Sequence, residues 1–181
     1  MSQIKVDSIV PSGGVVSGAS GGIVQTVFAE NNTIQSFSFN NQTFSPETVC
    51  SASITPRSTS NKILVYCSAG VFANGQTAQN YEFSLHLKRG STLIGGNTKS
   101  TQFLGTNVLF SGVNAPESAT TGSFFYLDSP STTDSTTYNL CLQGGESITY
   151  GTGRSYNDGP STLYNYQNSP GTSMVLLEVS A

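Results

Sequence analysis

Side chains able to perform acid–base or metal chemistry are scarce in this sequence. Its one histidine, His86, lies between Leu85 and Leu87 in a segment where apolar and polar residues alternate. An imidazole can serve as a general base or a pH switch, but a position within a predicted strand favours a surface or interface histidine. Because no second histidine and no closely spaced cysteine pair accompanies it, the sequence predicts no zinc site.

The three cysteines are spread along the chain, which is not the pattern of a disulfide framework or a redox pair. Cys50 and Cys67 each alternate in step with apolar residues, so we predict buried free thiols that pack as small hydrophobic groups. Cys141 falls on the more polar face of its segment, and the pattern leaves its burial open. A disulfide is the less favoured alternative for a chain made in a cytoplasm.

The ten acidic residues include no pair that the sequence marks as catalytic. A glycosidase needs only two carboxylates at a suitable separation, so that function stays open as a disfavoured alternative. The segment Gly151–Arg154 has the glycines of a phosphate-binding loop, but no predicted helix follows it to supply the dipole. We therefore predict a protein that is not an enzyme and has no catalytic residues, metal ion or cofactor.

Residues 144–172 are the part of the chain best suited to contact a partner, because they are polar and rich in tyrosine. Tyrosine offers rigid contact area with a hydrogen-bonding tip, and asparagine and aspartate can bond to hydroxyl groups. This mixture suits a glycan or protein surface; with equal weight, the tyrosines could pack between subunits or rest on the protein's own body. The candidate contact residues are Tyr150, Arg154, Tyr156, Asn157, Asp158, Tyr164, Tyr166 and Asn168.

A strand–turn–strand at 81–94 is the clearest element that could position such residues. From Tyr81 to Lys88 apolar and polar side chains alternate, which predicts one apolar face and one wet or partner-facing face. Arg89-Gly90-Ser91 places a glycine where a tight turn needs a positive φ, and Thr92–Ile94 begins the return strand.

The remaining chain shows short strand-like segments separated by Gly, Pro and Asn, and no convincing helical period. This pattern predicts an all-β, antiparallel β-sandwich, jelly-roll-like, over residues 23–181. Residues 62–72 are apolar on both faces and are expected to form a central, buried strand. The predicted strands are Ile23–Phe28, Ile34–Phe39, Thr48–Thr55, Lys62–Phe72, Gln102–Phe110, Ser123–Asp128, Thr137–Gln143 and Ser173–Val179.

Residues 1–22 differ from this head domain. A short segment with apolar points at Ile4, Val6, Ile9 and Val10 ends at Pro11, and a Gly/Ser-rich linker follows. Such a composition cannot fold alone, so we predict an extended attachment arm that docks on another chain by strand addition or in a groove. A flexible tail is the alternative.

The charge and hydropathy of the chain restrict its partners. Charged residues make up 9% of the sequence, against roughly 25% in typical soluble proteins, and the net charge of −3 argues against binding nucleic acid. The start of the sequence lacks the apolar core of a signal peptide, and no run approaches a membrane span. We therefore expect synthesis in a cytoplasm, no membrane insertion, and a low-charge surface suited to contacts between copies.

Four stretches of the sequence stand out together: Met1–Gly14, Ser53–Val65, Leu87–Gly95 and Leu127–Thr133. In this order they resemble the tail-fibre and related appendage proteins of marine bacteriophages, especially those that infect cyanobacteria.

The resemblance implies a virion structural protein, made in the host cytoplasm and displayed on the virion surface as a homotrimer of jelly-roll-like heads. The arm would attach it to other virion proteins, and the head would contact a bacterial surface glycan or protein. The family brings no catalytic residues. Because the arm passes into the head without a long shaft, the implied roles are a short tail-fibre or tail-tip appendage and, as the alternative, a capsid decoration, cement or head-fibre protein.

Overall fold

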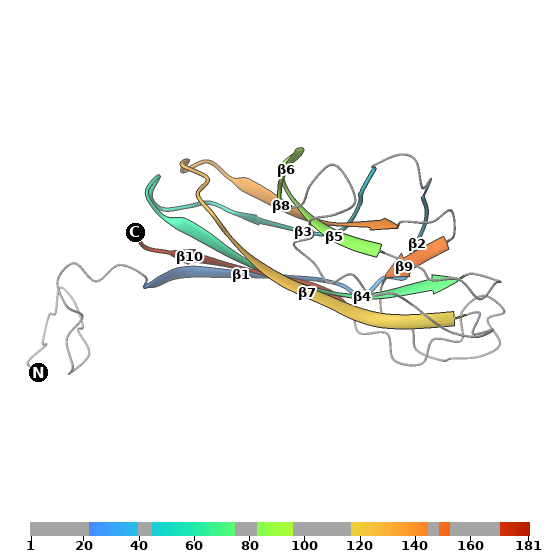
Figure 1. Cartoon of the computed structure of the whole chain (residues 1–181). Helices are drawn as coiled ribbons and strands as arrows, with labels where there is room; N and C mark the ends of the chain where they lie inside the picture. The colour runs from blue at the N-terminus through green and yellow to red at the C-terminus, as the bar shows by residue number, and fades with distance from the viewer. Residues whose placement is uncertain (1–21, 40–44, 75–82, 96–116, 145–148, 153–170) are drawn as a thin grey trace, which may run out of the picture.

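The computed structural model describes residues 22–39, 45–74, 83–95, 117–144, 149–152 and 171–181, which form strands and no helix. Figure 1 shows them as two stacked layers. All pairings between the strands are antiparallel, so the predicted all-β sandwich is confirmed. The strands are β1 (Ile23–Asn31), β2 (Gln35–Ser38), β3 (Glu47–Ile54), β4 (Lys62–Asn74), β5 (Phe83–Arg89), β6 (Thr92–Gly95), β7 (Glu117–Asp128), β8 (Thr136–Gly144), β9 (Thr149–Thr152) and β10 (Thr172–Val179).

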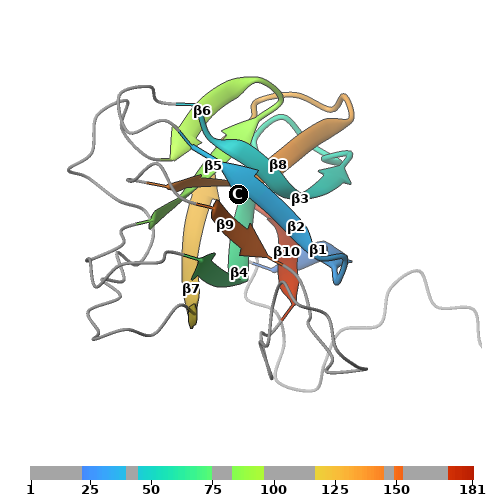
Figure 2. The ribbon, with the colours of Figure 1, turned by 90° about the vertical axis from the view of Figure 1, so that its right-hand side faces the viewer.

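Two sheets divide these strands between them. Sheet A has the order β1-β10-β4-β9-β2, with β7 on the other edge of β4, and sheet B has the order β3-β8-β5-β6. The chain passes from one sheet to the other between β2 and β3, β3 and β4, β4 and β5, β6 and β7, β7 and β8, and β8 and β9. This repeated crossing is the connectivity of a jelly roll, and the end-on view in Figure 2 shows the two layers around a common interior.

The core lies between the sheets and follows the two-residue alternation of the strands. Ile63, Val65 and Cys67 of β4 point inward and are fully buried, and they face Leu140 and Leu142 of β8, which are also inaccessible. Burying such side chains contributes about 1.5–3 kcal/mol each. The core is therefore specified by the inward positions of the predicted strands.

The turn chemistry predicted for the hairpin at 81–94 is confirmed from residue 83 onward. Gly90 has a φ of 59°, and Arg89 pairs with Thr92 across the β5–β6 turn. Positive φ at this position is the reason that glycine is favoured there. Phe37 and Phe39, which the two-residue alternation of the segment 34–39 puts on one face, have ring centroids 6.1 Å apart.

Three features differ from the sequence prediction. β7 begins at Glu117, six residues before the predicted Ser123, because the polar segment 117–122 pairs with residues 69–74 of β4. β9 lies in the segment predicted as loop, and its short polar sequence becomes a strand through pairing with β2 and the end of β4. β4 is central in sheet A as expected, but only its inner face is buried, since Tyr66 on the other face is 46% exposed.

Some predicted features lie outside the described residues. They are the attachment arm, the first two residues of the segment at 81–94, and the strand Gln102–Phe110. Among the residues that the structure describes, no helix is long and apolar enough to cross a membrane.

Candidate functional site

One end of the sandwich, which we call the arm end, carries residue 22, the end of β10, and the turns at 55–61, 89–92 and 129–135. The strand pairings set this arrangement, because Lys62 pairs with Val179 and Ile63 pairs with Asp128. Gly22 N–H donates to Ser180 Oγ at 3.1 Å, and Ser180 N–H donates to the Gly22 carbonyl at 2.9 Å. Figure 1 shows the start of β1 beside the C-terminus at this end. The first described residue is therefore hydrogen-bonded to the residue that follows the last strand.

Glu178 organises the turn at 55–61. Its side chain is completely buried, and Oε1 accepts from the Arg57 N–H at 2.7 Å and from Asn61 Nδ2 at 2.6 Å. Gln25 Nε2 donates to Oε2 at 2.6 Å and to the Thr55 carbonyl at 2.7 Å. Burial alone would raise the pKa of Glu178, but the hydrogen bonds from Asn61, Gln25 and Arg57 outweigh it and lower that pKa below its usual value. The carboxylate is thus ionised and holds the turn against β1 and β10.

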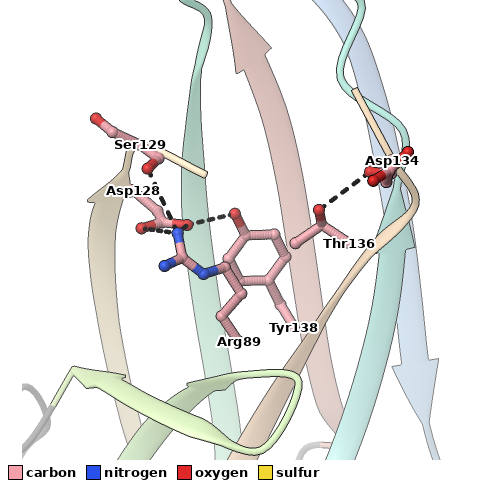
Figure 3. A network of polar contacts seen from close by, with 6 residues as sticks. All are labelled: Arg89, Asp128, Ser129, Asp134, Thr136 and Tyr138. Carbon is pink, nitrogen blue, oxygen red and sulfur yellow. Dashed lines mark hydrogen bonds and ion pairs between the residues drawn. The ribbon is translucent and has the colours of Figure 1, made fainter. Parts of the chain in front are cut away.

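Asp128 forms a second buried carboxylate hub at the same end (Figure 3). Arg89 Nη1 donates to its two oxygens at 3.1 and 2.9 Å, and the fully buried Tyr138 hydroxyl donates to Oδ2 at 2.6 Å. Burial raises the pKa of Tyr138 far above its usual value, and the hydrogen bond to Asp128 and the negative charge of that residue raise it further. The phenol therefore stays protonated. The hub joins β5, β7 and β8.

Backbone-directed bonds fix the other two turns of the arm end. Asn139 Nδ2 donates to the Gly90 carbonyl at 2.8 Å, and the Gly90 N–H donates to the Thr137 carbonyl at 2.8 Å. In the β7–β8 connection, the Asp134 N–H donates to Thr132 Oγ1 at 3.0 Å. Thr136 Oγ1 donates to the Asp134 carbonyl at 3.1 Å, and Figure 3 shows this second bond. The arm end thus contains three hydrogen-bonded turns, at 55–61, 89–92 and 129–135.

The polar side of β5, predicted to be wet or to face a partner, lies on the outer face of sheet B, and at Ser84 and His86 it is not wet. Ser84 and His86 are only 6% and 3% exposed, and Ser84 Oγ lies 2.7 Å from His86 Nε2. Burial, and then the nearby charge of Lys88, lower the pKa of His86 to about 4. Such an imidazole is neutral near pH 7 and a poor base there. The Ser–His pair is therefore part of the packed structure, and the Lys88 ammonium donates to the Pro46 carbonyl at 3.1 Å.

All three cysteines are free and buried. This confirms the predicted burial of Cys50 and Cys67 and settles the position left open, because Cys141 is fully inaccessible and its Sγ lies 3.5 Å from Thr48 Oγ1. Burial raises the pKa of each thiol above its ordinary value, which is the condition of an unreactive cysteine. Within the described ranges, no three His, Cys, Asp or Glu side chains are grouped so that they could share a metal ion.

The predicted contact residues are only in part described by the structure. Tyr150 lies in β9, where its backbone pairs with Phe37 of β2 and with Ala73 of β4. The other candidates from Arg154 to Asn168, and the arm residues Ile4, Val6, Ile9, Val10 and Pro11, lie outside the described residues.

A surface that sequence reasoning missed covers the outer side of sheet A across β1, β10, β4 and β7. Two adjacent rows of paired residues lie there, and we call them together the apolar face. The first row is Phe28, Val175, Tyr66 and Phe125. The second row is Thr26, Leu177, Leu64 and Leu127.

The apolar face is exposed in the single chain. Phe125 is 71%, Phe28 60% and Leu127 51% accessible. The signal was present in the sequence, in the apolar residues on both faces of 62–72 and in the consecutive apolar residues of 124–127 and 175–177. The sequence prediction assigned both faces of residues 62–72 to the core.

Comparison with known proteins yields no match to a protein family and none to a curated protein. Among solved structures, the chain is similar to "Structure of infectious bursal disease virus Gx strain", with a TM-score of 0.41 and 14% sequence identity. That similarity covers 98% of this chain and 45% of the other, so this chain spans less than half of its length. A likeness at this level adds nothing to the two-sheet architecture already described.

Proposed function

We propose that this chain is a phage virion structural protein, a short tail-fibre or tail-tip appendage subunit. Residues 1–22 anchor it to other virion proteins, the sandwich assembles with copies of itself as a trimer on the virion surface, and the loops that include 144–172 contact a host surface glycan or protein. One observation carries the proposal. The stretches 53–65, 87–95 and 127–133, on which the resemblance to appendage proteins rests, overlap the hydrogen-bonded turns of the arm end. An anchored head needs a rigid base beside its attachment point.

A capsid decoration, cement or head-fibre protein is the second candidate. It is favoured by the absence of a shaft between the arm and the sandwich, since β1 begins at Ile23, directly after the Gly/Ser-rich linker. The two roles share the anchor and differ in whether the loops that include 144–172 bind a cell.

Binding of the labelled, purified chain to cyanobacterial cells and to a glycan array tests the adhesion role. The variants Tyr156→Ala and Tyr164→Ala should reduce binding at least several-fold, since aromatic anchors dominate such contacts, whereas Ile34→Ala, at an exposed apolar residue of the β1–β2 turn, should bind as the parent does. Unchanged binding in both tyrosine variants would show that the loops including 144–172 do not contact the host. If the parent chain does not bind at all, the decoration role is favoured.

Deletion of residues 1–14 tests the anchor that both roles share. The shortened chain should fold normally but fail to join particles when it is produced during infection. Its incorporation at the normal level would refute the anchor. Release of reducing sugar from host envelope by the purified chain would instead revive the disfavoured glycosidase alternative.

A further inference from the structure

We propose that the apolar face is the surface through which copies of this chain contact one another. The inference deepens one part of the proposed function, namely that the chain assembles with itself, by naming the surface involved. It depends on the geometry of sheet A and not on the identity of the particle.

The first argument is size. A fully exposed aromatic side chain presents about 150–250 Å², so Phe28, Tyr66 and Phe125, at 60%, 46% and 71% exposure, leave about 300–400 Å² of aromatic surface in contact with water. Soluble monomers rarely expose contiguous apolar patches larger than a few hundred Å², and larger ones mark interaction sites. Leu127, 51% exposed, and the half-buried Val175 extend it toward the roughly 800 Å² per partner of a stable interface.

The second argument is charge, and it selects a copy of this chain over a different partner. The two rows contain no charged residue. Beyond them lie Glu30 at one end of the face and Lys62 at the other, so the face as a whole carries no net charge. An identical face approaches it without repulsion, whereas a different partner is normally selected by complementary charge, which these rows lack.

The third argument is shape and rigidity. The rows lie on four neighbouring strands held by continuous ladders, from the β1–β10 pairing to the β4–β7 pairing. Sheet faces of this kind pack on one another at about 10 Å separation, with their side chains interdigitated. The face is therefore preformed, and association needs little reordering of the backbone.

Sedimentation velocity and light scattering of the full chain over a wide concentration range provide the test. The parent should be an oligomer, whose mass gives the number of copies. The double variant Tyr66→Thr, Phe125→Thr should dissociate at a concentration at least 10-fold higher. The matched control is Ile34→Thr, which replaces an apolar residue that is 46% exposed outside the face and should assemble as the parent does. Circular dichroism establishes that each variant is folded.

Cross-linking provides a second measurement that does not require weakening the fold. Tyr66→Cys places a thiol on the apolar face, and a short bis-maleimide should link two copies. Ile34→Cys and the parent, whose own three thiols are buried, should stay unlinked.

If the double variant still assembles and Tyr66→Cys gives no cross-link, the apolar face is not the contact surface, although the chain still associates with itself. The assignment also falls if Ile34→Thr disrupts assembly as strongly as the double variant does. A parent chain that is monomeric at every concentration removes both the surface and the proposed self-association.

Discussion

Two regions on the outer surfaces of the sandwich have opposite characters. On sheet A the apolar face is exposed, with Phe125 71% accessible, whereas on sheet B the polar patch formed by Ser84, His86 and Cys141 is buried, with His86 3% and Cys141 0% accessible. The polarity of a residue therefore does not report its solvent contact in these two regions. Hydrogen bonds allow the polar patch of sheet B to be buried, and the apolar face of sheet A is available for association.

The largest contrast is expected when the same charge is introduced on each surface. Cys141→Lys places an ammonium in a fully buried site near the charge of Lys88, and we expect it to lower the free energy of unfolding by about 4 kcal/mol or more. Tyr66→Lys, at an exposed site, should cost less than about 1 kcal/mol when measured at a concentration where the chain is monomeric. Urea unfolding measures both, and equal losses would contradict the contrast.

The pH dependence of stability sharpens the description of sheet B. The pKa of His86 is lowered to about 4 from 6.5, so between these values the unfolded chain binds a proton that the folded chain does not. Stability from this group is therefore complete above pH 6.5 and falls as the pH drops toward 4, by about 3 kcal/mol. Unfolding measured at several pH values should show a shallower slope in His86→Gln. An unchanged slope would mean that His86 is solvated.

Glu178→Gln tests whether a buried carboxylate stabilises the folded chain when all its hydrogen bonds are made. The change removes the charge that three donors share, and we expect a loss of about 2–3 kcal/mol near pH 7. Because its folded pKa is lowered, the carboxylate's contribution is present above its ordinary pKa of about 4.3 and is lost as the pH falls through the folded value. The variant and parent should thus converge in strongly acidic buffer, and a constant difference would rule out the ionised hub.

A smaller effect is expected at Gly122, a buried residue of β7 that packs against sheet B. A Cβ on Gly122 would lie 2.9 Å from Cδ1 of the buried Leu85, so Gly122→Ala should cost about 1 kcal/mol through local repacking. At Gly22 the nearest atom is Ser180 Oγ at 3.6 Å, and Gly22→Ala should be close to neutral. Thermal unfolding of both variants measures the difference, and a neutral Gly122→Ala would show that Leu85 has room to move.

The smallest effect belongs to the apolar face itself. Phe125→Thr should change the unfolding free energy of the dilute monomer by less than about 0.5 kcal/mol, because the ring makes little contact within the chain. At concentrations where the parent assembles, the same variant should unfold at a lower temperature than the parent does. A concentration-independent loss would place the ring in the core of the single chain.

The sequence predicted the strands and their inward positions well, because alternation reports the face that meets the core. It placed β5, β8 and β10 within two residues of their observed bounds and identified the glycine of the β5–β6 turn. Alternation cannot tell whether the second face of a strand is wet, since that depends on segments distant in sequence. His86 and Tyr66 were therefore misassigned in opposite directions.

Prediction of the candidate site was weaker for the same physical reason. The turn residues stood out by type, but the hubs at Glu178 and Asp128 depend on partners far along the chain, such as Gln25 and Arg89. Short polar strands such as β9 carry no alternation of their own and form only because neighbouring strands supply hydrogen-bond partners.

The clamp between Gly22 and Ser180 has a mechanical consequence. When residue 22 is pulled and the opposite end of the sandwich is held, the force runs parallel to β1. It then loads the antiparallel β1–β10 ladder in shear. The bonds of that ladder then share the force and must fail together, whereas a pull across the strands would open them one after another. A head tethered in this way resists being torn from its support while the other end is gripped.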